Sequence, residues 1–226
     1  MVIYCRVRFL RRLVDPRDSG SFANRLRERR FERFRALVAR IPGPIRILDV
    51  GGTPGFWQLR GRELPGPPSV VCLNLEEQVS DDPTISTVVG DAVHMPQFED
   101  QSFDVVFSNA VIEHVETLEN QARMASEIRR VGQRYFVMTP NRGFPLEPHF
   151  LFPGFQFLPM CARVALLRRM NLGWYAREPD PIQAEKRVRL IRLMSEREFR
   201  QVFPDATIHR ERLLGLTKSF TAYQGF

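Results

Sequence analysis

A glycine-rich turn placed directly after a short β-like run constrains this chain most. Residues 45–50 are mostly apolar and lead into Gly51-Gly52-Thr53-Pro54-Gly55. Glycines allow positive φ and close approach of the backbone to a ligand, and the short helix predicted to follow offers free N–H groups. Because many nucleotide-binding domains share such a turn, it is a weak signal when it stands alone.

β-like runs alternate with helical segments after this turn. Strands are predicted at 70–73, 85–89, 103–107 and 135–138, and a helix at 118–131. This alternation predicts right-handed βαβ units and a mostly parallel sheet. At the end of the chain, a helix at 195–203 and strands at 206–213 and 219–223, joined through a turn at Gly215, predict an antiparallel hairpin at the sheet edge.

The segment before the first strand has a different character. Residues 22–41 show apolar side chains at helical spacing, with Ser21 as the expected N-cap and Pro42-Gly43-Pro44 ending the helix. We therefore expect a basic N-terminal segment with an amphipathic helix at 1–44 and an α/β domain at 45–226. Residues 141–194 are expected to form an insertion within that domain.

The excess positive charge lies before the α/β domain. Residues 1–46 hold 13 Arg and 4 acidic residues, whereas the remaining 180 residues hold 20 basic and 22 acidic residues. A basic arm of this kind can contact nucleic acid or an anionic membrane surface. A solvated helical face is the simpler interpretation and the one we favour.

Cysteine usage and hydropathy narrow the class of protein. Cys5, Cys72 and Cys161 show no CxxC spacing, which argues against a disulfide framework and against a zinc site, and indicates a reduced, cytoplasmic setting. The most apolar window, 150–167, is interrupted by two prolines and Arg163, so no membrane span is predicted. The first residues lack the pattern of a signal peptide.

Polar residues follow the later strands as well. Asn74 and Glu76 end the second strand, at the place where a side chain can accept hydrogen bonds from ribose hydroxyls. Gly90-Asp91-Ala92 follows the third strand, where an Asp can accept from an exocyclic amine of adenine. Since ligands bind at the carboxyl ends of the strands of an open α/β sheet, these turns and the first one predict a single nucleotide site.

The order of four motifs, LDVGGTPG, GDA, SFDVVFSNAVIEHV and ERLLGLTKSFTAY, resembles class I S-adenosylmethionine-dependent methyltransferases. The branch of quinone-biosynthesis methyltransferases is the most similar, and the resemblance covers residues 45–140 and 195–223. It implies a Rossmann-like α/β fold with a mostly parallel seven-stranded sheet, an antiparallel C-terminal hairpin and helices on both faces. It also implies S-adenosylmethionine as the cofactor and no metal.

The resemblance assigns the cofactor-binding residues by position. Asp49 and the turn with Gly51, Gly52, Thr53 and Gly55 would hold the methionine part, Asn74 or Glu76 the ribose, and Asp91 with Ala92 the adenine. Ser108 and Asn109 would lie beside the sulfonium and the substrate. A bulky side chain at Gly51 is expected to abolish binding with little loss of fold. Thr53 and Asn74 depart from the family's usual glycine and acidic residue.

Two histidines are candidate catalytic bases. His149 lies in the insertion that shapes the acceptor site in the family, and a histidine suits proton removal near neutral pH. His114 follows the fourth strand. The alternative for each is a structural, hydrogen-bonded residue. Glu113 is expected to be a solvent-facing or capping group rather than a catalytic acid.

Three functions remain open from the sequence. The first is a methyltransferase for a small or lipid-like acceptor, which we favour. The second is an RNA methyltransferase with a basic N-terminal arm, disfavoured because an Asn/Asp-Pro-Pro-Tyr signature is absent. The third is a non-catalytic module. Residues 141–175 are expected to form a lid, in which Phe150, Phe152 and Phe155 select an apolar acceptor and peripheral membrane contact is possible. The oligomeric state is left open.

Overall fold

The computed structural model describes residues 22–64 and 66–226, and its contacts divide the chain into two compact units. One unit comprises residues 34–141 and 192–226. The other comprises residues 22–33 and 142–191. The expected N-cap, Ser21, lies outside the described residues, and the expected domain limits at 44, 141 and 194 stay predictions.

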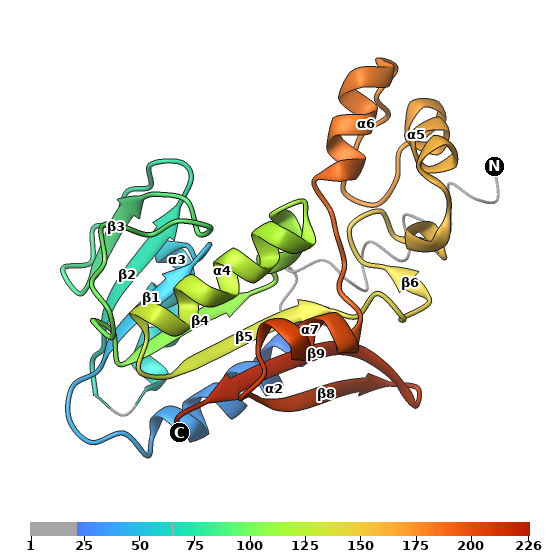
Figure 1. Ribbon diagram of the computed structural model, residues 1–226. Helices are drawn as coiled ribbons and strands as arrows, with labels where there is room; N and C mark the ends of the chain where they lie inside the picture. Colours follow the sequence, from blue (N-terminus) through green and yellow to red (C-terminus); the bar gives the residue numbers. More distant parts are fainter. Residues whose placement is uncertain (1–21, 65) are drawn as a thin grey trace. The chain divides into compact units, whose positions relative to one another are not determined.

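The first unit is built on a seven-stranded sheet of order β3-β2-β1-β4-β5-β9-β8 (Figure 1). The neighbours β3, β2, β1, β4 and β5 run parallel, whereas β9 is antiparallel to both β5 and β8. This confirms the expected Rossmann-like methyltransferase architecture. The strands are β1 (Arg46–Val50), β2 (Ser69–Asn74), β3 (Ile85–Val89), β4 (Val105–Asn109), β5 (Tyr135–Pro140), β8 (Thr207–Leu213) and β9 (Leu216–Gln224).

β4 and β9 differ most from their predicted limits. β4 begins two residues late, because Phe103 forms only an isolated bridge to Gly132 and Asp104 accepts a hydrogen bond from the Arg46 backbone N–H at 2.7 Å. β9 is longer than expected, since it pairs with β5 along one side and with β8 along the other. The predicted hairpin at the sheet edge is confirmed.

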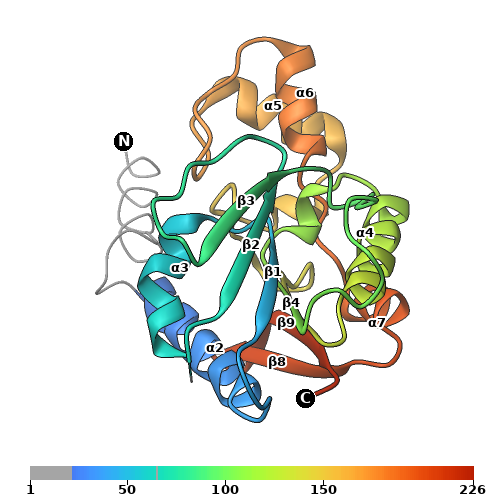
Figure 2. The ribbon, with the colours of Figure 1, turned by 90° about the vertical axis from the view of Figure 1, so that its left-hand side faces the viewer.

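Helices cover both faces of this sheet. Figure 2 shows α4 (Leu118–Val131) and α7 (Glu196–Val202) on one side and α3 (Pro54–Arg60) on the other. The apolar side of α4 buries Met124, Ala125 and Ile128 in the main core, so its helical spacing is explained by burial. Short 3₁₀ turns, η1 (Gly61–Glu63) and η2 (Ile112–His114), follow α3 and β4.

The helix α2 (Phe22–Val38) continues from one unit into the other and ends close to the predicted Pro-Gly-Pro stop. Its Phe34 belongs to the sheet unit and is fully buried. The Phe34 ring packs edge-on against Trp57, Phe107 and Phe136, with centroids 4.8–6.3 Å apart. Aromatic pairs of this geometry stabilise beyond their buried area, so they form an aromatic core on the side of the sheet that carries α3.

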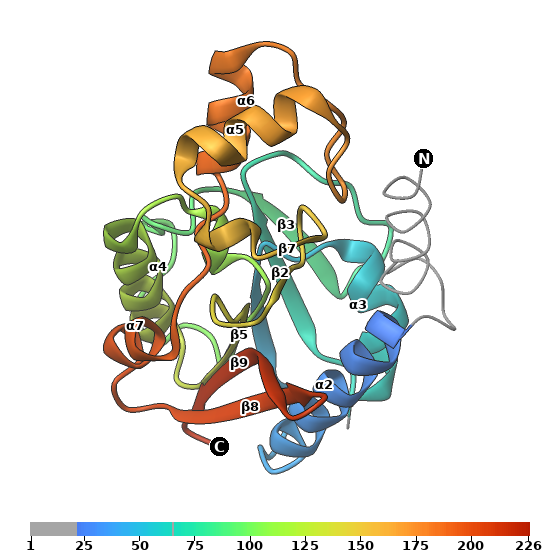
Figure 3. The ribbon, with the colours of Figure 1, turned by 90° about the vertical axis from the view of Figure 1, so that its right-hand side faces the viewer.

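The second unit has its own small core. Residues 142–191 form a two-stranded ribbon, a 3₁₀ turn and two helices that pack on each other (Figure 3). Phe150 is buried and stacks on Phe155 at 4.2 Å and on Tyr175 at 4.8 Å. The elements are β6 (Leu146–Glu147), β7 (Phe152–Pro153), η3 (Phe155–Phe157), α5 (Met160–Arg169) and α6 (Pro181–Arg189).

The aromatic residues of this unit require a correction. Phe150 and Phe155 are each 1% exposed, so they form the unit's interior and not the exposed aromatic surface that the sequence predicted. A triple substitution of Phe150, Phe152 and Phe155 by Ser would therefore damage packing before it tested acceptor use. Among the helices in the described part of the chain, none is long and apolar enough to cross a membrane.

Candidate cofactor site

The predicted ligand residues of the sheet unit come together at the carboxyl edge of the parallel strands. In register, Asp49 pairs with Cys72 and Phe107, and Asn74 pairs with Val89. The last residues of β1, β2, β3 and β4 therefore end on the same edge. In an open α/β sheet this edge is where ligands bind, and the turns after these strands are the ones singled out in the sequence.

The glycine turn after β1 is fixed by its neighbours. Gly51 has φ +77°, and a Cβ added there would lie 2.5 Å from Cγ2 of Val111. A Cβ on Gly52 would collide with the Asp49 carboxylate. Both glycines are thus required by the protein's own packing. The expectation that a side chain at Gly51 spares the fold is wrong, because the side chain would meet Val111 before any ligand.

Gly55 is different from these two glycines. It lies in the first turn of α3, and a Cβ added there would have nothing within 4 Å. The preceding residue Thr53 caps this helix with an extended backbone but without a side-chain hydrogen bond. The unobstructed surface over Gly55, beside the N–H groups that begin α3, is the place where a ligand can approach the backbone closely.

The buried side chain of Asp49 supports the glycine turn from inside the protein. Its side chain is buried, and Oδ2 accepts a hydrogen bond from Nε1 of Trp57 at 2.6 Å. Burial raises the pKa of Asp49 to about 7, and the bond from Trp57 opposes that rise. Burial also raises the pKa of the neighbouring Cys72 thiol to about 12, with the charge of Asp49 adding to the effect. The carboxyl group is therefore part of the loop's internal support.

Asn74 joins the second strand end to the glycine turn. Its Nδ2 donates a hydrogen bond to the carbonyl of Gly52, and its backbone carbonyl accepts from Gly90 N at 2.8 Å. A carboxylate at this position has no proton to donate to Gly52. The amide thus gives the turn a bond that the family's usual acidic residue lacks, and it leaves Oδ1 as the acceptor for a ligand. Glu76 is exposed in the loop beyond.

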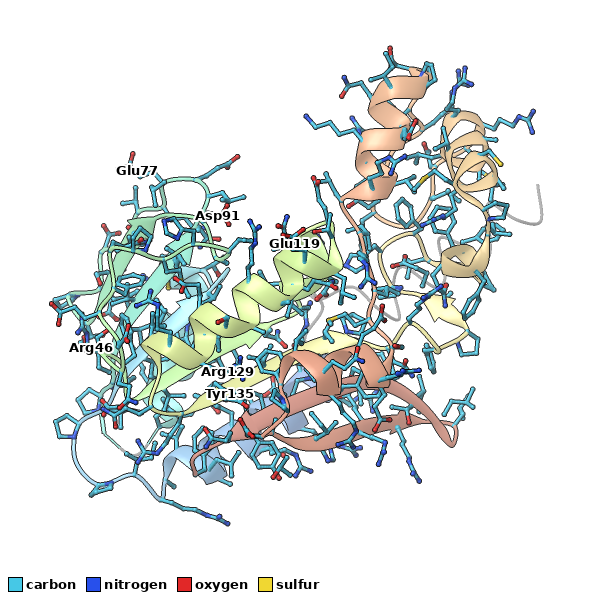
Figure 4. The ribbon with its side chains drawn as sticks, viewed as in Figure 1. Arg46, Glu77, Asp91, Glu119, Arg129 and Tyr135 are labelled. Atoms are coloured by element: carbon cyan, nitrogen blue, oxygen red, sulfur yellow. The ribbon has the colours of Figure 1, made fainter. Side chains whose placement is uncertain are left out.

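The turn after β3 places an exposed carboxylate at the same edge. Asp91 Oδ1 accepts from Val93 N at 2.9 Å, and the Asp91 carbonyl accepts from His94 N at 3.1 Å. Ala92 is half-buried and packs against the core. Figure 4 shows Asp91 and Glu77 close to the same end of the sheet, in the loops after β3 and β2. This arrangement keeps the Asp91 side chain at the surface of the candidate site.

Ser108 and Asn109, the two residues at the end of β4 that were expected beside the sulfonium, have different surroundings. Ser108 has no exposed surface, and its Oγ donates to the carbonyl of Val50 at 3.2 Å, which ties β4 to β1. Asn109 is half-buried at the strand end. The next residue, Ala110, has φ +61°, a conformation that costs energy for a residue with a Cβ. Ser108 thus shapes the site from within, and Asn109 is the residue at the surface.

The 3₁₀ turn η2 places Glu113 inside the protein and His114 at the surface. Glu113 has no exposed surface; Oε2 accepts from Oγ1 of Thr139 at 2.9 Å, and its carbonyl accepts from Arg192 N at 2.8 Å. The expectation of a solvent-facing Glu113 is wrong, because the turn directs this side chain toward β5. His114 is exposed in the same turn.

Comparison with known proteins assigns the domain that these turns belong to. Residues 48–134, which contain the three strand-end turns, match the family model of a methyltransferase domain. This part of the chain is similar to a methyltransferase domain. Two uncharacterized proteins from strains of Mycobacterium tuberculosis are 37% identical over 65 residues. That match covers 29% of this chain and 22% of each relative, so the chain spans about a fifth of their length.

Solved structures share the fold of this chain. The PH0226 protein of Pyrococcus horikoshii OT3 has a TM-score of 0.53 and 17% sequence identity. The match covers 96% of this chain and 97% of the PH0226 chain. Phospholethanolamine N-methyltransferase 2 of Haemonchus contortus, in complex with phosphomonomethylethanolamine and S-adenosylhomocysteine, has a TM-score of 0.52 at 16% identity, covering 84% and 39%. A Rhodobacter sphaeroides structure named for putative Zn-dependent alcohol dehydrogenases has a TM-score of 0.56 and 13% sequence identity. The match covers 83% of this chain and 86% of the Rhodobacter chain. At such identities the likeness shows the fold alone.

His149 belongs to the second unit. Its Nδ1 lies 2.7 Å from Oε1 of Glu147, and Glu147 Oε2 accepts from the backbone N–H groups of His149 and Phe150 at 2.8 and 2.5 Å. Glu147 is 1% exposed. Because a carboxylate only accepts, the imidazole must donate from Nδ1, which makes Nε2 the basic nitrogen of the neutral ring.

Several residues that shape these sites carry only a weak signal in the sequence. Trp57 lies eight residues after Asp49, and no motif in the sequence marks it as the partner of that carboxyl group. Val111, which covers Gly51, looks like any other apolar residue. Glu147 was detectable in principle, since a carboxylate two residues before a histidine is a common orienting partner.

Proposed function

We propose that the protein transfers a methyl group from S-adenosylmethionine to a small or lipid-like acceptor. One observation carries the proposal: the methyltransferase domain ends its parallel strands in the glycine turn, Asn74 and Asp91, all on one edge. The methionine part would lie over Gly55 and the start of α3, the ribose at Asn74 or Glu76, and the adenine at Asp91 and Ala92. The Haemonchus enzyme with the same fold holds S-adenosylhomocysteine in its structure, which supports this choice of cofactor.

The main task of the protein in this reaction is to align the acceptor with the methyl group. The sulfonium of the bound cofactor supplies an activated methyl group, so the protein must orient the acceptor in line with it and exclude water. The glycine turn, held by Asp49 and Asn74, fixes the donor side of this geometry. Asn109 would lie beside the reacting groups, with Ser108 supporting the strand behind it.

An acceptor that must lose a proton requires a base, and we propose His149 for this role, with His114 as the alternative. The hydrogen bond that His149 Nδ1 donates to Glu147 supports this choice, because it orients the ring and leaves Nε2 as the acceptor nitrogen. The chain from the end of β5 to His149 is nine residues, which can span up to about 30 Å when extended.

The experiment that tests the proposal measures cofactor binding first and transfer second. Calorimetric titration with S-adenosylhomocysteine should give a single site in the full chain. A screen with S-adenosylmethionine labelled in its methyl group, against a fractionated small-molecule and lipid extract, should then yield a labelled product. A folded protein that binds neither cofactor form is a non-catalytic module, and label found only in RNA would replace the acceptor class proposed here.

A further inference from the structure

The turn between β8 and β9 carries exposed leucines at its end. Leu213 pairs with Leu216, so Leu214 and Gly215 form a two-residue turn between them. Leu214 is 94% exposed and Leu216 is 51% exposed. A single exposed leucine is ordinary on a protein surface, but here two flank one glycine at the end of a hairpin. Residues 213–216 are called the hairpin tip below.

Leu214 also has an unfavourable backbone conformation. Its φ is +51° and that of Gly215 is +81°, as in the two central residues of a type I′ turn. Asn, Asp and Gly are the usual first residues of such a turn, because the left-handed region costs energy for most residues that have a Cβ. Neither the turn nor the core accounts for a leucine at this position.

The charges beside the hairpin tip leave a cation in excess. The Arg210 guanidinium pairs with Glu196 at 2.6 Å. Lys218 Nζ lies 3.5 Å from Oε1 of Glu211. Arg212, one residue before the tip, is exposed, and no ion pair in the described part of the chain includes it. An exposed Arg next to exposed leucines complements a surface that is anionic outside and apolar beneath.

The hairpin tip lies on the same edge of the sheet unit as the glycine turn. Asp49 on β1 pairs with Phe107 on β4. Phe136 on β5 pairs with both Phe107 and Tyr223, so these four residues stand at one level across the sheet. Leu216 precedes Tyr223 by seven residues on β9 and therefore projects about 24 Å past this level, toward the carboxyl ends of the parallel strands. Figure 1 shows the turn beyond the end of β5.

We propose that the hairpin tip docks the protein on a membrane that contains anionic lipids, with Leu214 and Leu216 in the interfacial layer and Arg212 at the headgroups. A bilayer fits a projecting tip, since lipids rearrange around it. A second copy of the chain fits less well, because two leucines cover far less than the roughly 1,200 Å² that stable protein interfaces bury. The docking stands on these residues alone. Delivery of a lipid-like acceptor to the cofactor edge rests on the proposed function.

Vesicle flotation of the whole chain tests the docking. Vesicles of phosphatidylcholine alone are compared with vesicles that also contain phosphatidylglycerol, at low and at high salt. Leu214→Asn removes the apolar side chain and introduces a residue suited to positive φ, and Leu214→Gly is a second variant with the same purpose. Arg212→Gln removes the excess charge. Leu59→Gln is the matched control, because Leu59 is 69% exposed on α3 of the same unit.

We expect the wild type to float with the anionic vesicles and both Leu214 variants to bind them at least about tenfold more weakly, the scale of burying one leucine side chain. Leu214→Asn should keep or raise the thermal midpoint, because it relieves the turn of strain. Arg212→Gln should weaken binding to anionic vesicles at low salt only. Leu59→Gln should bind as the wild type does. A wild type that does not float, or equal losses in Leu59→Gln and Leu214→Asn, would overturn the docking.

Two further measurements separate the membrane from another occupant and from the cofactor site. Sedimentation equilibrium without lipid should give the same mass for the wild type and Leu214→Asn, and a dimer that this variant loses would make a second copy the occupant instead. S-adenosylhomocysteine affinity should be equal in both proteins. Leu214-dependent flotation of a protein that binds no S-adenosylhomocysteine contradicts the proposed function alone, whereas cofactor binding without flotation contradicts the docking alone.

Discussion

Trp57 donates its indole N–H to Oδ2 of Asp49 over 2.6 Å, and this bond joins the first turns of α3 to the end of β1. Asp49 is 2% exposed, so the bond lies inside the protein. The pair fixes the floor of the glycine turn, since the same carboxylate fills the space that a Cβ on Gly52 would need.

The Asp49 carboxyl should make stability depend on pH. Burial raises its pKa from 3.8 to about 7, so the folded state binds more protons than the unfolded state between these values. The free energy of unfolding should therefore fall as pH rises from about 4 to 7 and level off above, by about 1.4 kcal/mol per pKa unit at most. Asp49→Asn keeps an acceptor for Trp57 and should remove this slope. Urea unfolding of both proteins at pH 5 and pH 8 measures it, and identical slopes would contradict the assignment.

Proton release should distinguish the two roles of Asp49. If the ammonium group of the cofactor binds beside this carboxyl, it favours the ionised form, and binding at pH 7 releases a proton. Calorimetry with S-adenosylhomocysteine in two buffers of different ionisation enthalpy measures that proton. We expect release in the wild type and none in Asp49→Asn. Equal, buffer-independent heats in the wild type would leave Asp49 as a support of the loop only.

Gly55 offers a cleaner test of the cofactor position than Gly51. Because a Cβ at Gly55 meets nothing within 4 Å, Gly55→Leu should stay within about 1 kcal/mol of wild-type stability, as leucine is a better helix former than glycine. It should weaken S-adenosylhomocysteine binding at least tenfold by occupying the ligand's space. Gly61→Ala is the control at the other end of α3, where the nearest atom to a Cβ is 3.8 Å away. Unchanged affinity in a folded Gly55→Leu protein would place the cofactor elsewhere.

Gly51→Ala, unlike Gly55→Leu, should destabilise the fold itself. The new Cβ would lie 2.5 Å from Cγ2 of Val111, and the backbone has φ +77°. We expect a loss of about 1–3 kcal/mol in unfolding free energy, of which Val111→Ala in the same chain should restore part. Denaturant melts of the single and double variants measure this coupling. Full additivity of the two changes would show that the contact with Val111 is not the cause.

Asn74→Asp should weaken both the turn and the site. The aspartate has no donor for the Gly52 carbonyl and places a negative charge beside it, which should cost about 1–3 kcal/mol of stability. Glu76→Gln, in an exposed residue two positions on, should leave stability unchanged. Titration with S-adenosylhomocysteine then separates the alternatives for ribose. Loss of affinity in Glu76→Gln without loss of stability would assign the ribose to Glu76 instead of Asn74.

Glu147 should set the tautomer of His149. The carboxylate accepts from Nδ1 at 2.7 Å, so nitrogen NMR of the ring should show the form protonated at Nδ1. Glu147→Gln keeps a carbonyl acceptor and should retain much of this preference, whereas Glu147→Ala should lose it together with the order of the loop at Phe150. If His149 is the base, methyl transfer should fall in the same order. A wild-type ring protonated mainly at Nε2 would contradict the pairing.

The sequence predicted the elements whose signals are local. The limits of β3 and α4 follow from β-branched runs and from helical apolar spacing, and both lie where these patterns place them. The glycine turn and the residues after β2 and β3 were also readable, because strand ends in a parallel sheet share one edge. What the sequence left out was the start of β4, which depends on a bond between Asp104 and the backbone of Arg46, 58 residues away.

The tertiary structure decided which polar groups are buried or hydrogen-bonded within the protein. From the sequence, Glu113 looked exposed and Phe150 looked like part of an acceptor surface, yet both are buried. Asn74 looked like a weakened ligand, yet its amide gives the turn a bond that a carboxylate has no proton to make. Local patterns fix where strands, helices and turns form, since those depend on neighbours in the chain. Burial and pairing depend on contacts between distant segments, and only the folded arrangement supplies them.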